Sequence, residues 1–317
     1  MNKLVLLLPE RKHCVASVAI AEGTLAAWCA RGDRLAATGP SETELLRTCF
    51  DWPGTSLPVA ALSRQFDAGD AQGSAWLRAD PCHIRADMVT ARMLACGNLG
   101  LTDEECAAIA RDLRPIFGDS GFEFEATRTE RWYLRAPVDS RLPLSAGPDE
   151  VLGDDLKLHL PEGADGKRWR HLFNEAQVVL HNHPANAARA RRGAVSVNGL
   201  WFWGAGVLPS FVRSRVQVVH SDRPELRGLA SLAGIDSRAL GTHHARPELT
   251  AAEQTGLYDL RDLRDRDLEE NWLAPFADDL GKGRCEEIVV HFASGERAAV
   301  RRAHRWRWWR RVHGLRA

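Results

Sequence analysis

Three side chains that could bind an anion lie close together in the sequence. Asp80 begins an Asp-Pro turn, and His83 and Arg85 follow it at alternating positions. On an extended segment, His83 and Arg85 would point to the same side. Arg85 could then hold a phosphate or carboxylate through paired hydrogen bonds, with His83 beside it as a donor or acid. The alternative, which the residues alone favour, is a structural turn in which Asp80 accepts backbone N–H groups and Arg85 pairs with Asp87.

A second group of polar side chains begins where a predicted helix must stop before a proline. The group contains His183, Asn186, Arg189 and Asn198, and the spacing places Asn186 and Arg189 on one helix face. His183 could bind an anion, or it could instead interact with the last carbonyls of the preceding helix. His181 and His183 have no third ligand within reach in the sequence, so we predict no metal site here.

The densest basic and aromatic stretch of the chain is 301–311, in which arginines alternate with Trp306, Trp308 and Trp309. Such a stretch could contact nucleic acid or a membrane surface. It could instead dock Trp306 and Trp309 on the core and leave the arginines in water, which is the interpretation we favour. Binding of a protein partner through this stretch is a further hypothesis.

The composition is that of an ordinary globular protein. The chain has 317 residues, of which 44% are apolar and 26% charged, a length that suits two domains. Lys and Arg number 42, as do Asp and Glu, so no overall charge favours nucleic acid or an anionic membrane. The seven cysteines include no CxxC pair, which predicts free thiols in a cytoplasmic protein. No apolar run is long enough for a signal-peptide core or a membrane span.

The outer parts of the chain predict an α/β core. The apolar run 3–8 is typical of a strand buried on both faces, and helical spacing follows over 15–30. Near the other end, 287–300 predicts a hairpin around a Gly-containing turn. Residues 251–280 are interpreted as two charged helices, with Asp259 on a solvated face.

The middle third has the character of an α+β module. Thr102 and Glu105 have the spacing of a capping box and predict the start of a helix. The segments 121–124 and 132–134 alternate like two strands of a hairpin. Strands that pair locally beside helices are typical of an α+β arrangement.

These patterns predict an α/β protein with helices on both faces of a core sheet. We expect the core domain to comprise residues 1–79 and 213–317, so that it is discontinuous in sequence. The α+β module would be inserted between these parts, over residues 80–212.

The segments 80–85, 183–193 and 198–206 together resemble the archaeal-type cofactor-independent phosphoglycerate mutases of the alkaline phosphatase superfamily. Those enzymes open an inserted domain with an Asp-Pro…Arg segment. They close it with His-Pro-x-Asn-x-x-Arg-x-x-x-Gly, an Asn, and an apolar strand ending in Gly-x-Gly. The segment 226–236 resembles the helix by which that family returns to its core domain. The resemblance implies an alkaline-phosphatase-like core sheet.

The whole chain also resembles the RpfE-type regulatory proteins. The segments that carry this likeness are 77–81, 130–134, 200–204 and 306–311. This second resemblance implies a regulatory role.

The resemblance to the mutases is weakest where their catalytic chemistry resides. The superfamily holds two metal ions with Asp and His around a Ser or Thr nucleophile. Its first strand ends in Asp-Gly, whereas here the strand 3–8 runs into Pro-Glu-Arg-Lys. The Asp-x-x-x-His and Asp-His pairs that the superfamily carries later in its sequence have no counterpart here after Gly234. Ser63 is the only candidate for the nucleophile, and no Asp follows it in the sequence.

The residues of the inserted domain that would hold substrate are retained. The resemblance implies that Arg85, Arg189, Asn186 and His183 contact the phosphate and carboxylate of a small ligand. We therefore predict a non-catalytic, pseudoenzyme-like regulatory protein that binds a small phosphorylated or carboxylated metabolite, without a cofactor. The alternative is an active phosphoglycerate mutase or phosphatase whose metal ligands are relocated.

Overall fold

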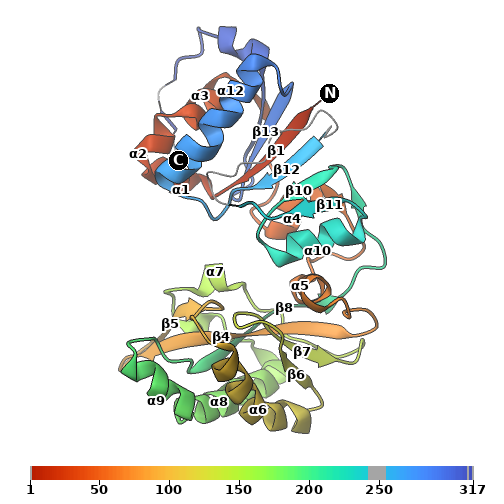
Figure 1. The fold of residues 1–317 in the computed structure, drawn as a ribbon, viewed down its shortest axis with the longest axis vertical. Coiled ribbons are helices and arrows are strands. Elements are labelled where there is room, and N and C mark those ends of the chain that lie inside the picture. Colours follow the sequence, from red (N-terminus) through yellow and green to blue (C-terminus); the bar gives the residue numbers. More distant parts are fainter. Residues whose placement is uncertain (1, 242–254, 313, 316–317) are drawn as a thin grey trace. The chain divides into compact units, whose positions relative to one another are not determined.

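A seven-stranded sheet forms the centre of the first of two compact units. The computed structural model describes residues 2–241, 255–312 and 314–315, and the first unit comprises Met1–Ser56 and Pro209–Ala317. Five neighbouring strands pair in parallel, and two further strands join at one edge through antiparallel pairings. In spatial order they are β11 (Asp236–Arg238), β10 (Val218–His220), β12 (Thr255–Asp259), β1 (Lys3–Leu8), β13 (Glu287–Phe292), β14 (Arg297–Arg301) and β2 (Asp33–Leu35) (Figure 1).

Helices cover both faces of this sheet (Figure 1). On one face, Leu6 of β1 shares a hydrophobic cluster with Trp28 and Phe276, whereas Thr48 contacts His291 on the other. Because both faces are covered, β1 is buried along Leu4 to Leu8, as its apolar sequence predicts. The first face carries α1 (Arg11–Ala16), α2 (Val18–Ala21), α3 (Thr24–Arg31), α11 (Asp265–Leu268), the π-helical turn η3 (Glu269–Leu273) and α12 (Ala274–Lys282); the other carries α4 (Glu42–Arg47) and α10 (Pro224–Leu232).

The second unit, Leu57–Leu208, is built on an antiparallel sheet. Its long central strand pairs with β8 on one side and with β5 and β7 on the other. Helix α6 begins with the predicted capping box of Thr102 and Glu105. The strands are β4 (Ala75–Ala86), β5 (Ala91–Cys96), β6 (Glu123–Ala126), β7 (Trp132–Ala136) and β8 (Gly199–Val207); the helices are α5 (Val59–Ala68), α6 (Asp103–Asp119), α7 (Pro148–Val151), α8 (Gly163–His181) and α9 (Pro184–Arg191).

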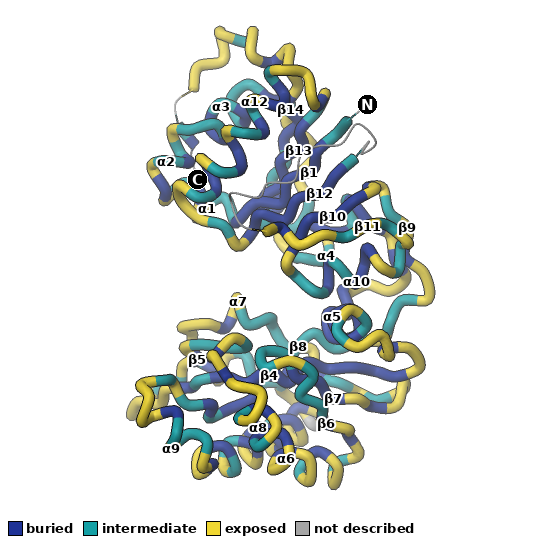
Figure 2. The backbone as a smooth tube through the Cα atoms, viewed as in Figure 1, coloured by how far each residue is buried: buried dark blue, intermediate teal, exposed yellow. Residues whose placement is uncertain are grey.

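The prediction of an α/β core sheet that carries an inserted α+β module is confirmed. The compact insert begins at Leu57, whereas the predicted boundary between residues 79 and 80 falls inside β4. Helix α5 packs on β8 and β4, which explains why it and the first half of β4 belong with the insert. Figure 2 shows each sheet as a buried layer.

Among the described residues, no helix is long and apolar enough to cross a membrane.

Two local predictions were wrong. Residues 15–30 form three short helices rather than one, because Ser17 and Gly23 adopt extended backbone conformations between them. The segment 251–280 contains strand β12, which pairs with both β1 and β10. This short strand is flanked by charged residues, so its place beside β1 comes from tertiary pairing rather than from a local pattern.

Candidate functional site

The segment 195–198, which includes the predicted ligand-binding residue Asn198, runs beside β4 and contacts His83. The Nδ1 atom of His83 lies 2.9 Å from the carbonyl oxygen of Ser196. Asn198 accepts a hydrogen bond from the backbone N–H of Ile84 at 2.7 Å and donates to the carbonyl oxygen of Ile84 at 2.7 Å. The Asn198 amide therefore pairs with one residue of β4 as a neighbouring strand would.

His183 and Asn186 hold the beginning of helix α9. His183 is buried, accepts a backbone N–H as the residue that caps α9, and lies 3.3 Å from the carboxylate of Asp112. The Asn186 amide donates to the carbonyl oxygens of Leu180 at 2.7 Å and Val197 at 2.8 Å, and accepts from the N–H of Val197 at 2.9 Å. Both side chains thus join α8, α9 and the segment before β8.

Arg189 is completely buried. Its guanidinium donates to the carbonyl oxygen of Val195 at 2.8 Å, to that of Leu99 at 2.5 Å and to the Glu105 carboxylate at 2.8 Å. Because Glu105 also completes the capping box of α6, Arg189 connects that helix to the loop after α9. The predicted anion-binding arginine is therefore engaged inside the insert.

Asp80 does not form the predicted turn, because it lies within β4. Its buried carboxylate accepts two hydrogen bonds from Arg78, at 2.9 and 2.8 Å, and one from Nε1 of Trp203 at 2.8 Å. Burial raises the pKa of Asp80, against the opposing effect of Arg78.

Arg85 lies exposed near the end of β4 and makes no side-chain hydrogen bond or ion pair with any residue that the structure describes. The predicted pairing with Asp87 is absent from the described contacts, since Asp87 accepts from the N–H groups of Val89 and Thr90. The register shift after His83 leaves Leu94 of β5 unpaired, so β4 keeps its alternation, with Ile84 buried between the more exposed His83 and Arg85. The structure thus brings His83, Asn186 and Asn198 to one segment, and leaves Arg85 outside their hydrogen bonds.

The carboxyl ends of the parallel strands form the other place where ligands bind in α/β sheets. Asp259 ends β12 there and is buried, not solvated as predicted. Arg261 donates to its two oxygens at 2.7 and 2.9 Å, and the Ser221 hydroxyl donates to it at 2.9 Å. Arg261 also donates to Glu42 at 2.6 Å. Sequence analysis missed this network; the apolar pair before Asp259 was the available signal of a strand.

Burial acts to raise the pKa of Asp259, but its attraction and hydrogen bonds to Arg261 outweigh burial, so the pKa lies below its usual range. A dication needs several free carboxylate or imidazole donors, whereas both oxygens of Asp259 already face a guanidinium. Within the described ranges, no three His, Cys, Asp or Glu side chains form a group that could hold a metal. The described donors therefore do not fit the two-metal site that the resemblance implies.

Ser63 does not present a nucleophile. It lies in α5 with no exposed surface, and its hydroxyl donates to the carbonyl oxygen of Ala60 at 3.2 Å. Arg78 donates to the same hydroxyl at 3.4 Å. A hydroxyl held in this way is closed to an attacking role in the described conformation.

The prediction that Trp306 and Trp309 dock on the core is wrong, because they are 66% and 63% exposed. Arginines dock this segment instead. Arg307 donates to Asp33 at 2.6 Å, and Arg310 donates to the carbonyl oxygen of Gly32 at 2.8 Å. Carbonyls at the end of α3 lack partners within the helix, which explains why they attract guanidinium donors.

No family model matches the chain. It is 33% identical over 94 residues to the "Probable 2,3-bisphosphoglycerate-independent phosphoglycerate mutase" of Geobacter sulfurreducens, covering 28% of this chain and 24% of that protein. It is 27% identical over 172 residues to the 2,3-bisphosphoglycerate-independent phosphoglycerate mutase of Methanothrix thermoacetophila, covering 50% and 43%. The matches thus span less than half the length of these two curated relatives.

Two solved structures are similar over most of the chain. The cofactor-independent phosphoglycerate mutase of Thermoplasma acidophilum is 16% identical with a TM-score of 0.42, over 95% of this chain and 89% of that one. The PH0037 protein of Pyrococcus horikoshii is 12% identical with a TM-score of 0.46, over 94% and 86%. By its curated sequence matches, the chain is a distant relative of the cofactor-independent phosphoglycerate mutases.

We predict that Arg189→Met lowers the free energy of unfolding by about 3–5 kcal/mol, because it leaves Glu105 without its buried cation. Urea denaturation measures the loss. The matched control is Arg191→Met on the exposed side of the same helix, which should cost less than about 0.5 kcal/mol. Equal stability of the two variants would contradict a structural role for Arg189.

Asp259 should contribute a pH-dependent part of the stability. Because its pKa is lowered on folding, its contribution is complete above the unfolded pKa and is lost as the pH falls through the folded pKa. The stability advantage of the wild type over Asp259→Asn should be greatest above about pH 5 and shrink below about pH 4. Urea titrations across this range test the prediction, and an advantage that does not change with pH would refute it.

Proposed function

We propose that this protein is a non-catalytic relative of the cofactor-independent phosphoglycerate mutases that binds a small phosphorylated or carboxylated metabolite in the cytoplasm. The observation that carries the proposal is the buried ion pair of Asp259 with Arg261 at the carboxyl edge of the core sheet. Arg261 donates to both oxygens of Asp259, so this carboxylate is not open to a metal ion of the kind that metal-dependent phosphoryl transfer uses. The RpfE-type resemblance supports a regulatory role.

The names of the two curated relatives, which are phosphoglycerate mutases, support this class of ligand. Of the predicted ligand-binding residues, Arg85 has its guanidinium exposed, and His83 lies two residues before it, half-buried. Asp80, His183, Asn186, Arg189 and Asn198 make hydrogen bonds within the insert. We therefore propose that Arg85 is the residue of the insert that contacts the anion, with His83 beside it.

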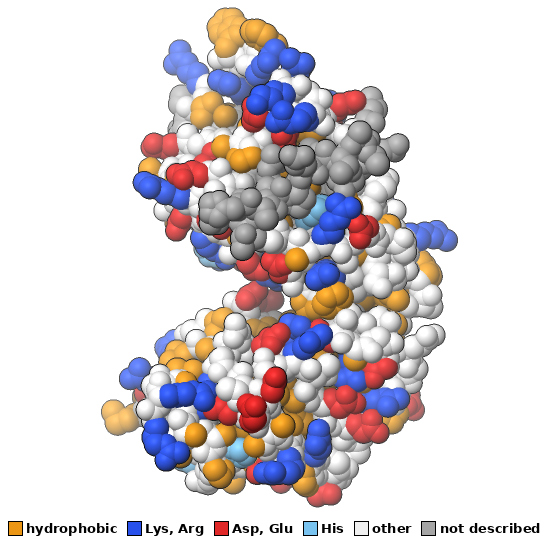
Figure 3. Space-filling view, in the orientation of Figure 1, with side chains coloured by type: hydrophobic (Ala, Val, Ile, Leu, Met, Phe, Trp, Pro, Cys, Tyr) orange, Lys and Arg blue, Asp and Glu red, His pale blue; other side chains and the backbone are white. Residues whose placement is uncertain are grey.

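The exposed aromatic surface of the segment 301–311 supports a second role, the binding of a protein partner. Trp306, Trp308 and Trp309 are each more than 60% exposed. Figure 3 shows apolar and cationic side chains together at the end of the first unit where Figure 1 draws the segment 301–311 in dark blue. Tryptophan and arginine are the residue types that contribute most to protein interfaces. We propose that the segment 301–311 docks such a partner.

We expect purified protein to show no interconversion of 2- and 3-phosphoglycerate, with or without added Mn²⁺. Mass spectrometry of the metal content accompanies the assay, and the Methanothrix mutase serves as the positive control. Binding of 3-phosphoglycerate, measured by calorimetry, should weaken in Arg85→Ala. Turnover with a near-stoichiometric metal would overturn the proposal and favour an active mutase with relocated ligands.

The triple variant Trp306→Ser, Trp308→Ser, Trp309→Ser should keep the melting temperature of the wild type, because its tryptophans are exposed. In a pull-down from the source organism's extract, a partner should be retained by the wild type and lost by the variant. A lower melting temperature would show that the tryptophans support the fold. Identical retention by both proteins would refute docking through these side chains.

A further inference from the structure

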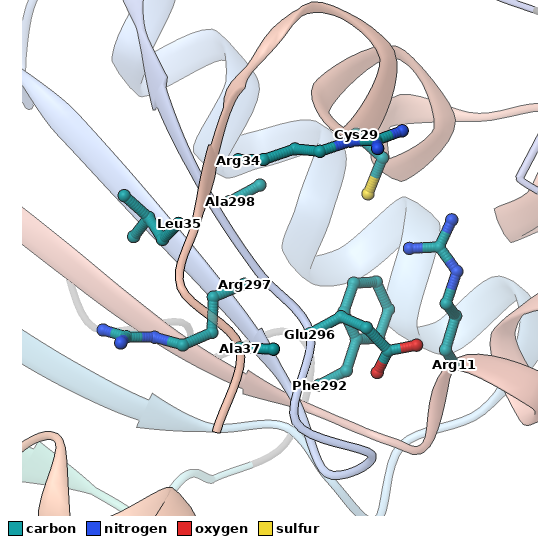
Figure 4. Close-up of a pocket in the computed structure, with 9 residues that line it drawn as sticks. All are labelled: Arg11, Cys29, Arg34, Leu35, Ala37, Phe292, Glu296, Arg297 and Ala298. Atoms are coloured by element: carbon teal, nitrogen blue, oxygen red, sulfur yellow. The ribbon is translucent and has the colours of Figure 1, made fainter. Parts of the chain in front are cut away.

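A pocket of about 370 Å³ in the first unit is lined by several arginines. Arg11 and Arg34 both extend toward Cys29 in Figure 4, whereas Arg297 points away from them. Glu296 is the carboxylate in the wall. The pocket therefore presents two guanidiniums around one thiol, with a single acidic group beside them.

The fold fixes the position of Arg11. It begins α1 directly after β1, and its backbone N–H donates to the Ser294 hydroxyl at 3.0 Å. Its guanidinium carbon lies 5.5 Å from the centre of the Phe292 ring, a cation–π contact that holds the side chain along the wall. Arg11 is thus an oriented part of the pocket.

Arg34 supplies the charge with the fewest constraints. Its strand β2 is held by pairing with Ala298 of β14. The side chain is exposed, and its guanidinium makes no hydrogen bond, ion pair or ring contact with residues inside the described ranges. It can therefore bond to a ligand without first breaking an internal contact.

The acidic groups nearby are already engaged. Glu296 accepts a hydrogen bond from the Ser294 hydroxyl at 2.5 Å. Asp33 lines a neighbouring pocket of about 550 Å³ and accepts from Arg307 at 2.6 Å. The two pockets share Cys29 and Arg34, and the second adds Arg310 and Arg311. The two pockets are lined by five arginines against the carboxylates of Glu296 and Asp33, and this excess of positive charge concentrates anions.

We propose that this pocket is a binding site for a phosphate monoester or inorganic phosphate, with Arg34 as the principal contact and Arg11 beside it. Guanidinium groups match phosphate oxygens through parallel hydrogen bonds, and a dianion balances two cations. The site lies in the core unit and is separate from Arg85; it rests on the proposed function only for the class of ligand. Such a site would let the core sense a phosphorylated compound without turning it over.

Cys29 supplies a direct reporter of occupancy. It is half-buried in the pocket, and burial raises its pKa to about 11. Cys96 in the insert is the other half-buried cysteine, whereas the remaining five are buried, so it serves as an internal control. Alkylation by iodoacetamide at about pH 9 modifies the small thiolate fraction of each, and peptide mass spectrometry gives the two rates separately.

With inorganic phosphate at constant ionic strength, the rate at Cys29 should fall by the factor 1 + [phosphate]/Kd, while the rate at Cys96 stays unchanged. Arg34→Gln should abolish this protection. The control Arg266→Gln removes an arginine that is 82% exposed elsewhere on the same unit and should retain protection. Circular dichroism confirms that each variant is folded.

The results of the alkylation and calorimetry experiments distinguish binding in this pocket from binding at Arg85 of the insert. Lack of protection of Cys29 in the wild type, or full protection in Arg34→Gln, would overturn the assignment. If phosphate does not protect Cys29 but calorimetry still detects binding of 3-phosphoglycerate, the proposed function is supported and the proposed pocket site is refuted. If Arg85→Ala weakens 3-phosphoglycerate binding while phosphate still protects Cys29, both sites hold.

Discussion

Burial of guanidinium groups is the constraint on which much of this structure depends. A cation removed from water is tolerated when a carboxylate and further acceptors replace its hydration, and removing one partner is costly. The protein meets this requirement with Arg189 at Glu105, Arg78 at Asp80 and Arg261 at Asp259. The first two pairs lie inside the insert, and the third lies at the carboxyl edge of the core sheet.

These pairs change how the family resemblance should be interpreted. A motif of Asp, His, Asn and Arg suggests a ligand site because the same residue types bind phosphate and carboxylate. In this protein Arg189 and Asn186 instead bind backbone carbonyls and join helices to the segment before β8. The distant likeness to the mutases is therefore compatible with a shared way of building the insert.

Two exposed arginines are the candidates for anion recognition in this structure. Arg85 in the insert and Arg34 in the core unit each have a guanidinium without a side-chain partner among the described residues. Exposed surface charge alone is weak evidence of a site. At Arg34 the charge adjoins a pocket, a second oriented arginine and a thiol, and this combination distinguishes it from a solvated surface.

The sequence by itself determined the elements whose signals are local. The apolar strand at Leu4 to Leu8, the capping box of Thr102 and the hairpin formed by β13 and β14 all follow from short patterns of burial and backbone hydrogen bonding. Only the tertiary structure decided which polar groups were available. The partners of Arg189 and Arg261 include Leu99 and Glu42, which lie far away along the chain. Likewise, Trp306 is exposed, whereas the neighbouring Arg307 donates to the carbonyl oxygen of Arg31 and to Asp33 of the core unit. No local sequence pattern predicts which of these side chains contacts the core.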